Sequence, residues 1–245
     1  MKITAEMTVG ELIQQVPAAE TVFEIVRIDS CCRRERTLAD ASAAAGIDVD
    51  EVISLLRELP HDASAHPVAL PPDAWLPEVT AQIREQYHRR ARAFLVMLTR
   101  MVRALSGSHG HAFPEIRTVR TQIEQLARDL VPHMSREEKY LFPYIDSLAG
   151  GRADREIVVP LFGKVEYPLQ FVKHDHSDDM LVIATLREST RNFAPPSGTC
   201  AGFRAFYSML GLFATELEEH IELENDVLFP RAVEAEKQIS QRASS

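Results

Sequence analysis

Apolar side chains recur every three or four residues along most of this chain, a period that predicts amphipathic helices. Four long segments carry this period, at residues 78–106, 115–148, 166–193 and 199–237. The breaks between them contain residues that end helices: Gly107, Gly110, Gly150, Gly151, Pro195 and Pro196. Four long helices with short connections favour an antiparallel up-down bundle.

A smaller helical unit, residues 1–58, precedes these segments. We expect four helices in this unit, at 9–13, 18–28, 38–45 and 51–59, each beginning at or next to a residue that commonly starts a helix. The expected caps are Thr8, Thr37 and either Asp48 or Asp50, with Pro17 expected at the first position of the second helix and Gly46 ending the third helix. Prolines cluster between the two units, so we predict a linker at 59–77 and the bundle at 78–238. The predicted fold class is all-α.

Composition narrows the choice of partners. The net charge is -9, from 36 acidic and 27 basic residues, which argues against nucleic acid as a partner. No apolar run approaches the ~18 residues of a membrane helix, and the N-terminus has no signal-peptide pattern, so we expect a cytoplasmic protein without a membrane partner. An odd cysteine count argues against a disulfide framework. Adjacent Cys31 and Cys32 are candidates for reactive or metal-binding thiols, whereas Cys200 is expected to be a small buried side chain.

One motif occurs twice in the bundle. His133 and Glu137 are followed by Leu-Phe-Pro at 141–143, and His220 and Glu224 are followed by Leu-Phe-Pro at 228–230. Positions i and i+4 share one face of a helix, so each motif presents an imidazole beside a carboxylate. The leucine and phenylalanine continue the same face and are expected to pack below the site.

The other two long helices each carry a candidate histidine. His88 lies on the first, and the third carries both His174 and His176. His174 and His176 point to different faces, and the apolar residues around them do not decide between the two. Asp178, four residues after His174, is a reserve carboxylate. Intervals of 45, 41 and 46 residues separate His88, His133, His174 and His220, so an up-down bundle can bring one histidine from each helix to one level.

Four imidazoles and two carboxylates favour a particular metal. The set has too many donors for a closed zinc site and too few carboxylates for calcium or magnesium, but it suits iron or manganese. Two glutamates can bridge two metals about 3.5 Å apart. Iron is the better choice because a di-iron pair can bind or reduce small diatomic molecules. We therefore predict two non-haem iron ions bridged by carboxylates, with an oxo bridge as a further option.

These residues resemble the hemerythrin-type HHE cation-binding domain, and the whole chain resembles the iron–sulfur cluster repair di-iron proteins. The resemblance rests on short stretches at 9–12, 17–23, 28–32, 37–38, 86–88, 132–134, 137–139, 141–143, 174–175, 195–196, 200, 219–221, 224–225 and 228–231. It implies a small cysteine-bearing domain before a hemerythrin-like bundle. It also implies six iron ligands, with His174 preferred to His176: His88, His133, Glu137, His174, His220 and Glu224.

The resemblance implies a function in repairing iron–sulfur clusters damaged by nitric oxide or peroxide. The expected part is that of iron donor, with Cys31 and Cys32 as transfer thiols. Nitric oxide reduction and non-catalytic sensing of nitric oxide or dioxygen are the alternatives, so catalysis is left open. Iron–sulfur client proteins are the expected partners, and a homodimer is an open option for assembly.

The chain departs from the family pattern at two places. Ser30 precedes the cysteine pair and Arg33-Arg34 follows it, where the family usually has Phe and Gly-Gly. These arginines should favour the thiolate form of the cysteines. Lys173 stands before His174, where the family usually has an acidic residue.

Overall fold

The structure of this protein is a computed structural model. It describes residues 3–16, 19, 22–23, 26, 28–30, 33–58, 70–71, 73–149, 163–199 and 201–243. These residues form helices and irregular connections, and the one isolated β-bridge among them joins Thr8 to Thr37. The predicted all-α class is confirmed.

The four predicted long helices are present, and three of them are interrupted by a short π-helical turn. Their parts are α5 Leu76–Gln82, η1 Ile83–His88 and α6 Arg89–His109; α7 Glu115–Arg136, η2 Glu137–Leu141 and α8 Phe142–Ala149; α10 Glu166–Ser189; and α11 Ala201–Glu222, η3 Leu223–Leu228 and α12 Phe229–Ala243. The third helix ends four residues earlier than predicted. Arg191, Asn192 and Phe193 have φ angles of 51, 60 and 59°, which a right-handed helix cannot include.

The small helices follow their predicted caps. Helix α1, Val9–Gln15, starts with a capping box in which Thr8 and Glu11 each accept the other's backbone N–H. Thr37 caps α3, Leu38–Ala45, and Gly46 ends it with a φ of 71°. Helix α4, Val49–Glu58, begins two residues before the predicted start, and the Asp48 carboxylate accepts the N–H of Asp50 at 2.7 Å. Much of the predicted 18–28 helix lies outside the described residues.

Arg34 connects the two described ends of the cysteine loop to α1. Its Nε donates to the carbonyl of Ser30 at 2.8 Å, and its own carbonyl accepts the N–H of Gly10 at 2.8 Å. Among the described residues, neither Arg33 nor Arg34 has a positive φ. The backbone at these two positions therefore does not require the glycines of the family pattern. Cys31 and Cys32 themselves lie outside the described residues.

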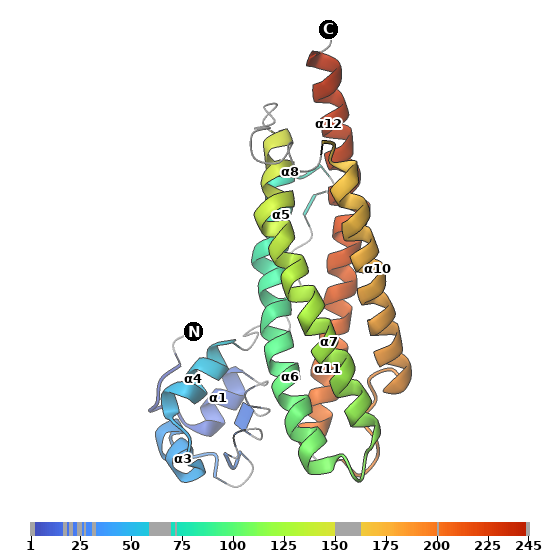
Figure 1. Ribbon diagram of the computed structural model, residues 1–245. Helices are drawn as coiled ribbons and strands as arrows, with labels where there is room; N and C mark the ends of the chain where they lie inside the picture. Colours follow the sequence, from blue (N-terminus) through green and yellow to red (C-terminus); the bar gives the residue numbers. More distant parts are fainter. Residues whose placement is uncertain are drawn as a thin grey trace. The chain divides into compact units, whose positions relative to one another are not determined.

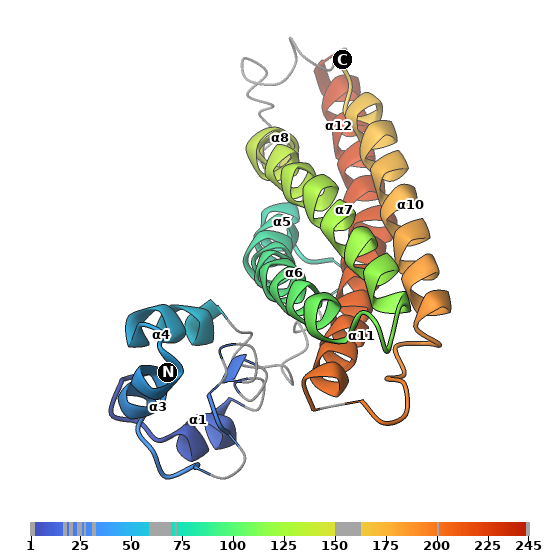
Figure 2. The same ribbon diagram turned by 60° about the horizontal axis from the view of Figure 1, so that its bottom comes forward.

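The chain divides into two compact units. Unit 1 comprises residues 1–66, 93–123 and 189–212, and unit 2 comprises 67–92, 124–188 and 213–245. The boundaries predicted from the sequence stay a prediction. Unit 2 contains a stretch of each long helix, and consecutive stretches run in opposite directions (Figures 1 and 2). In unit 1, stacked aromatic rings of Phe203 and Tyr207 pack at 5.6 Å between ring centres.

A hydrophobic core fills unit 2. Helices α5, η1, η2, α8, α10, η3 and α12 all contribute to it. Its residues include Leu76, Val79, Ile83, Leu141, Phe142, Ile145, Leu148, Leu169, Leu228 and Phe229. The leucine and phenylalanine of both Leu-Phe-Pro motifs belong to this core, as predicted. Because helices from both halves of the sequence share the core, it fixes the level at which their polar residues meet.

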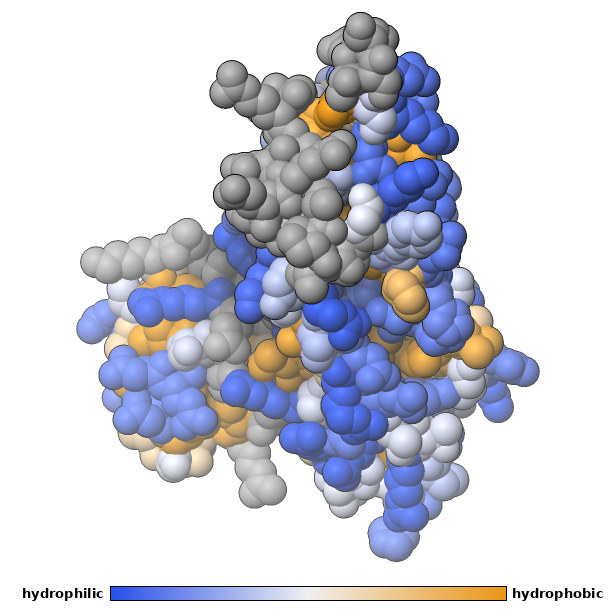
Figure 3. Space-filling model, turned by 45° about the horizontal axis from the view of Figure 1, so that its top comes forward, coloured by the Kyte–Doolittle hydropathy of each residue, from blue (hydrophilic) through white to orange (hydrophobic). Residues whose placement is uncertain are grey.

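Hydrophilic residues cover most of the surface that is coloured by hydropathy in Figure 3, in keeping with a sequence that is 26% charged. Within the described ranges, no helix combines the length and apolarity that crossing a membrane requires.

Candidate metal centre

Three long helices widen into a π-helical turn at the residues predicted to bind metal. His88 is the last residue of η1, Glu137 is the first residue of η2, and Glu224 is the second residue of η3. A π turn inserts one extra residue into a helix and changes the direction of the side chains next to it, and such turns are frequent at functional sites. The three turns therefore mark one level of the protein.

The repeated Leu-Phe-Pro motif accounts for two of these turns. The N–H of Phe142 donates to the carbonyl of Glu137, and the N–H of Phe229 donates to that of Glu224, each five residues back. The next residue is Pro143 in one case and Pro230 in the other. Because proline has no N–H, it cannot restore the α-helical bond to the carbonyl four residues back.

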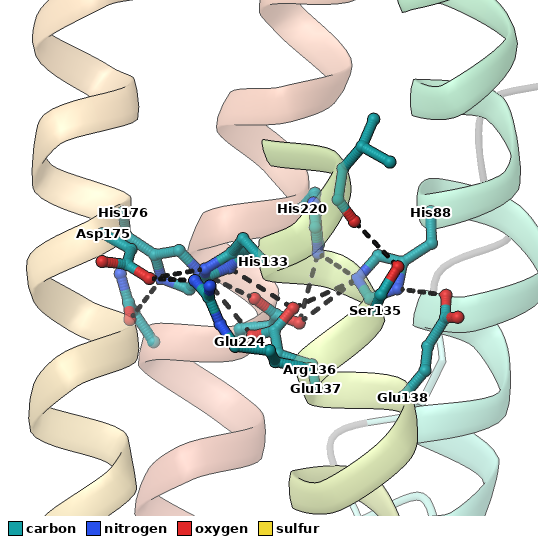
Figure 4. A network of polar contacts seen from close by, with 12 residues as sticks. His88, His133, Ser135, Arg136, Glu137, Glu138, Asp175, His176, His220 and Glu224 are labelled. Atoms are coloured by element: carbon teal, nitrogen blue, oxygen red, sulfur yellow. Dashed lines mark hydrogen bonds and ion pairs between the residues drawn. The ribbon is translucent and has the colours of Figure 1, made fainter. Parts of the chain in front are cut away.

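Six buried side chains converge from four helical segments onto one point (Figure 4). Their exposed fractions are at most 2%: His88, His133, Glu137, His176, His220 and Glu224. They form two overlapping groups, one with His88 and His220 and the other with His133 and His176. Both groups include Glu137 and Glu224, and the ligand atoms of each lie within 4.8 Å of one another. Two glutamates shared by two groups are what two adjacent metal positions with carboxylate bridges would require.

In the first group, the Nε2 atoms of His88 and His220 lie 3.1 Å apart. Nε2 of His88 is 3.5 Å from Oε2 of Glu137 and 3.8 Å from Oε1 of Glu224. Nε2 of His220 is 3.2 Å from the same Glu224 oxygen. Two imidazoles and two carboxylates thus face one small volume.

The second group has the same composition. Nε2 of His133 lies 3.3 Å from Oε2 of Glu137, and Nε2 of His176 lies 3.0 Å from Oε2 of Glu224. Nε2 of His176 is also 3.9 Å from Oε1 of Glu137. Each glutamate therefore approaches histidines of both groups.

The chemistry of these atoms fits a bound cation. Six of them are buried without a hydrogen-bond partner in the described structure: both carboxylate oxygens of Glu137 and of Glu224, and Nε2 of His133 and His176. A buried polar atom without a partner costs about 1–3 kcal/mol, so six converging on one point favour the binding of cations or protons between them. Metal ions at this point would satisfy all six.

Partners behind the ligands orient three of the histidines. Nδ1 of His88 bonds to Oε1 of Glu138 at 2.8 Å, and Arg92 binds the same oxygen at 2.8 Å. Nδ1 of His133 bonds to Oδ2 of Asp175 at 3.1 Å, and Arg136 binds that oxygen at 2.9 Å. Such carboxylate–histidine pairs fix the ring and the tautomer, which leaves Nε2 for the metal.

The third oriented ligand is His176, whose Nδ1 lies 3.2 Å from the amide oxygen of Asn225. The fourth histidine, His220, differs. Its Nδ1 is buried without a hydrogen-bond partner in the described part of the chain, and its ring stacks on Tyr87 at 5.6 Å.

The carboxylates around the site shift the pKa values of its histidines. Burial would lower the pKa of His133, but Glu137 and Asp175 outweigh it and raise this pKa to about 9. Burial also lowers the pKa values of His88 and His176, but nearby carboxylates outweigh it. Glu138 raises the pKa of His88, and Glu224 raises the pKa of His176. A raised pKa means that each of these histidines keeps its proton to a higher pH than a free imidazole, so metal binding competes with protons here.

We expect the metal-free protein to lose stability as the pH rises above neutral. The raised pKa of His133, about 9, means that its stabilising contribution is complete below the unfolded-state pKa and disappears as the pH passes through 9. That contribution is on the order of 3 kcal/mol. Urea unfolding of chelator-treated protein between pH 6 and 9.5 measures it, and His133→Gln should flatten the profile. A metal-free wild type that is equally stable at both ends would contradict this.

The structure contradicts the choice of His174 as the third histidine. Its side chain is 76% exposed, and its Nε2 lies 3.8 Å from the carboxylate of Asp178, which is 69% exposed. Asp178 is therefore not a reserve ligand either. The buried face of α10 includes Leu169, His176, Asp179, Ile183 and Leu186. These positions are spaced by three, four or seven residues, so the helix turns His176 inward and His174 outward.

This correction removes one departure from the family pattern. The residue before His176 is Asp175, so an acidic residue does precede the third histidine. Asp175 also bonds to His133. Lys173 lies three residues before His176 and is exposed.

Two cavities reach the site between α7–η2 and α10. One of about 520 Å³ has more acidic than basic residues in its wall, with His133 and the two arginines Arg128 and Arg136 beside four aspartates: Asp129, Asp175, Asp178 and Asp179. The other, of about 220 Å³, also reaches His133, together with Glu137. Its wall is mainly apolar, with Tyr140, Leu141, Pro168, Phe171 and Val172. The acidic cavity suits a cation and the apolar cavity suits a small uncharged molecule.

A helical bundle with histidines from all four of its helical segments and two shared glutamates defines a class of carboxylate-bridged metal proteins. Residues 80–232 match the sequence model of the hemerythrin HHE cation binding domain, and residues 5–60 match that of the ScdA N-terminal domain, a domain of unknown function. The chain belongs to the hemerythrin HHE cation-binding family.

Relatives align along nearly the whole chain. The iron-sulfur cluster repair protein YtfE of Pectobacterium atrosepticum is 30% identical over 237 residues, which cover 94% of this chain and 98% of the relative. The proteins of the same name from Edwardsiella ictaluri and Dickeya chrysanthemi are each 32% identical, over 91% and 94% of this chain and 95% and 98% of their own length.

Proposed function

We propose that this protein is a cytoplasmic di-iron protein that supplies iron for the repair of iron–sulfur clusters damaged by nitrosative or oxidative stress. The observation that carries the proposal is the pair of overlapping ligand groups that share Glu137 and Glu224. Relatives named as iron–sulfur cluster repair proteins, similar over 91–94% of this chain, support it.

Six residues would hold the two irons. His88 and His220 would bind one, His133 and His176 would bind the other, and Glu137 and Glu224 would bridge them. When bound, the irons supply both cargo for transfer and one-electron chemistry toward small diatomic molecules. The protein's own contribution is to orient the imidazoles through Glu138, Asp175 and Asn225 and to keep the bridging carboxylates away from water.

The acidic cavity supports donation of iron over mere storage. It extends from His133 through Asp175 to Asp129 and Asp178. A path lined by carboxylates lowers the electrostatic cost of moving a divalent cation between the site and solvent. Cys31 and Cys32 are the proposed acceptors, because thiolates beside arginines are good ligands for a soft transition metal.

The second candidate function is binding or reduction of nitric oxide. The apolar cavity of about 220 Å³ supports it, because its wall reaches both His133 and Glu137. A small uncharged gas enters apolar surroundings readily, whereas hydrated cations do not.

Transfer of labelled iron separates the two functions. Protein loaded with ⁵⁷Fe is mixed anaerobically with a hydro-lyase whose [4Fe–4S] cluster has been damaged by peroxide. We expect the client to recover activity and to contain the label. Cys31→Ser with Cys32→Ser should abolish recovery without lowering iron content, and Cys200→Ser is the matched control.

Nitric oxide consumption by the same iron-loaded samples completes the test. A wild type that consumes nitric oxide but leaves no label in the client would overturn iron donation in favour of the second function. The double cysteine variant should consume nitric oxide at the wild-type rate under either function.

A further inference from the structure

The metal centre has an approximate twofold symmetry in its ligands. His88 corresponds to His176, His133 to His220 and Glu137 to Glu224, and this exchange turns one ligand group into the other. The core below follows the same relation. Phe142 stacks on His88 with ring centres 5.5 Å apart, and Phe229 stacks on His176 with ring centres 6.0 Å apart.

The residues behind the ligands break this symmetry. Glu138 follows Glu137 and accepts a hydrogen bond from His88 with a charged carboxylate. Asn225 follows Glu224 and accepts one from His176 with a neutral amide oxygen. The residue before His88 on the first long helix also differs from the residue before His176 on the third. Asp175 bonds to His133, whereas Tyr87 only stacks on His220.

The partners behind the ligands do not all favour one group, because the amide of Asn225 weakens the group of His176, whereas Nδ1 of His220 has no partner in the described structure. Access to solvent distinguishes the groups more clearly. Of the four histidines, only His133 lies in the walls of the two cavities, and Asp175 lies in both walls with it. The Asp175–Arg136 pair is also the more open one, with side chains 40% and 61% exposed against 25% and 31% for Glu138 and Arg92. We name the group of His133 and His176 the cavity-side position and that of His88 and His220 the closed position.

We propose that the two metal positions release their metals at different rates, and that the cavity-side position releases first. Access sets this order, because an acceptor reaches His133 through either cavity. The neutral amide behind His176 favours the same order, since it leaves His176 a weaker ligand than a carboxylate leaves His88. The closed position keeps its metal and thereby keeps Glu137 and Glu224 in place for reloading. The inference deepens the proposed function and rests on it, because it identifies which iron is the cargo.

Release of iron to a chromogenic iron(II) chelator under anaerobic conditions tests the proposal. We expect two phases of one iron each from the wild type. Asn225→Glu should slow the fast phase and Glu138→Gln should accelerate the slow phase, each by roughly 10–100-fold, the usual effect of a partner behind a metal ligand. Asp226→Asn, at an exposed neighbour of Asn225, is the matched control and should change neither phase.

Ligand variants assign the phases independently. His176→Ala should leave one iron per chain that is released in the slow phase, and His88→Ala should leave one that is released in the fast phase. Simultaneous loss of both irons in a single phase from the wild type, or a slow phase that responds to Asn225→Glu, would overturn the proposal. Asn225→Glu and Glu138→Gln change no ligand, so these two variants still test the proposal if a ligand variant does not fold.

The release experiment contains no client protein, so it fails separately from the proposed function. Two-phase release without label in the client would contradict iron donation alone. Label in the client together with single-phase release would contradict the inequality of the two positions alone.

Discussion

Replacement of Glu137 by alanine is expected to reduce bound metal from two ions per chain to less than one. The Glu137 carboxylate faces His88 at 3.5 Å and His133 at 3.3 Å, so its loss removes a ligand from both positions at once. The fall in affinity should exceed the ~10–100-fold that follows loss of a partner behind a ligand. Elemental analysis, together with the near-ultraviolet absorption of aerobically purified protein, measures it.

Glu224→Ala should have the same effect, because Glu224 is the other carboxylate shared by both groups. Glu222→Ala is the matched control, since Glu222 lies two residues away on an exposed face and should leave two metals bound. Two metals retained by Glu137→Ala would contradict the bridging arrangement. Loss of metal from Glu222→Ala would show that the effect is not specific to the site.

The sequence predicts the helices well because their signals are local. Capping residues such as Thr8 and Thr37 satisfy backbone groups within three residues of themselves, so no tertiary contact is needed to place them. The Leu-Phe-Pro motifs are equally informative. A leucine four positions after an inward glutamate lies on the same face of the helix. The phenylalanine five positions after it joins the core because a π turn lies between them.

The choice between His174 and His176 depends on information that a local pattern lacks. In the sequence, Phe171 and Leu181 favour His174, whereas Val172, Met180 and Ile183 favour His176. In the structure, Phe171 and Leu181 are 74% and 67% exposed. Asp179 lies on the buried face with His176 and is only 5% exposed. A charged residue therefore interrupts the pattern of apolar residues that would identify this face in the sequence. Burial raises the pKa of Asp179 to about 6. A site that needs buried polar groups therefore weakens the pattern by which its helix face is predicted.

The internal repeat does not resolve this choice from the sequence either. The motif residues His133 and His220 are 87 positions apart, and the same offset takes His88 to position 175. That position is midway between the two candidates. A π turn changes helix phase by about one residue, and η1, η2 and η3 all occur at this level. The choice between His174 and His176 therefore depends on which face of each helix turns toward the core, and in the structure α10 turns His176 inward.

Replacement of His176 by alanine should therefore reduce bound metal from two ions to about one, whereas replacement of His174 should leave both. The two residues lie on the same helix, two positions apart, so each variant is the control for the other. His176 is 1% exposed and 3.0 Å from the bridging Glu224, and its ring also stacks on Phe229. His174 contacts only an exposed aspartate among the described residues.

Metal content and thermal unfolding of the two variants, measured side by side, distinguish ligation from packing. His176→Ala should lose one metal and also some stability, since it leaves a cavity above Phe229. His176→Asn keeps more of the volume and a polar donor, so it should recover stability without recovering the metal. If His174→Ala loses the metal and His176→Ala retains it, the preference implied by the family resemblance is right and the inward phase of α10 is wrong. Because the partner of Asp175 is His133, Asp175→Asn should weaken binding at the cavity-side position too.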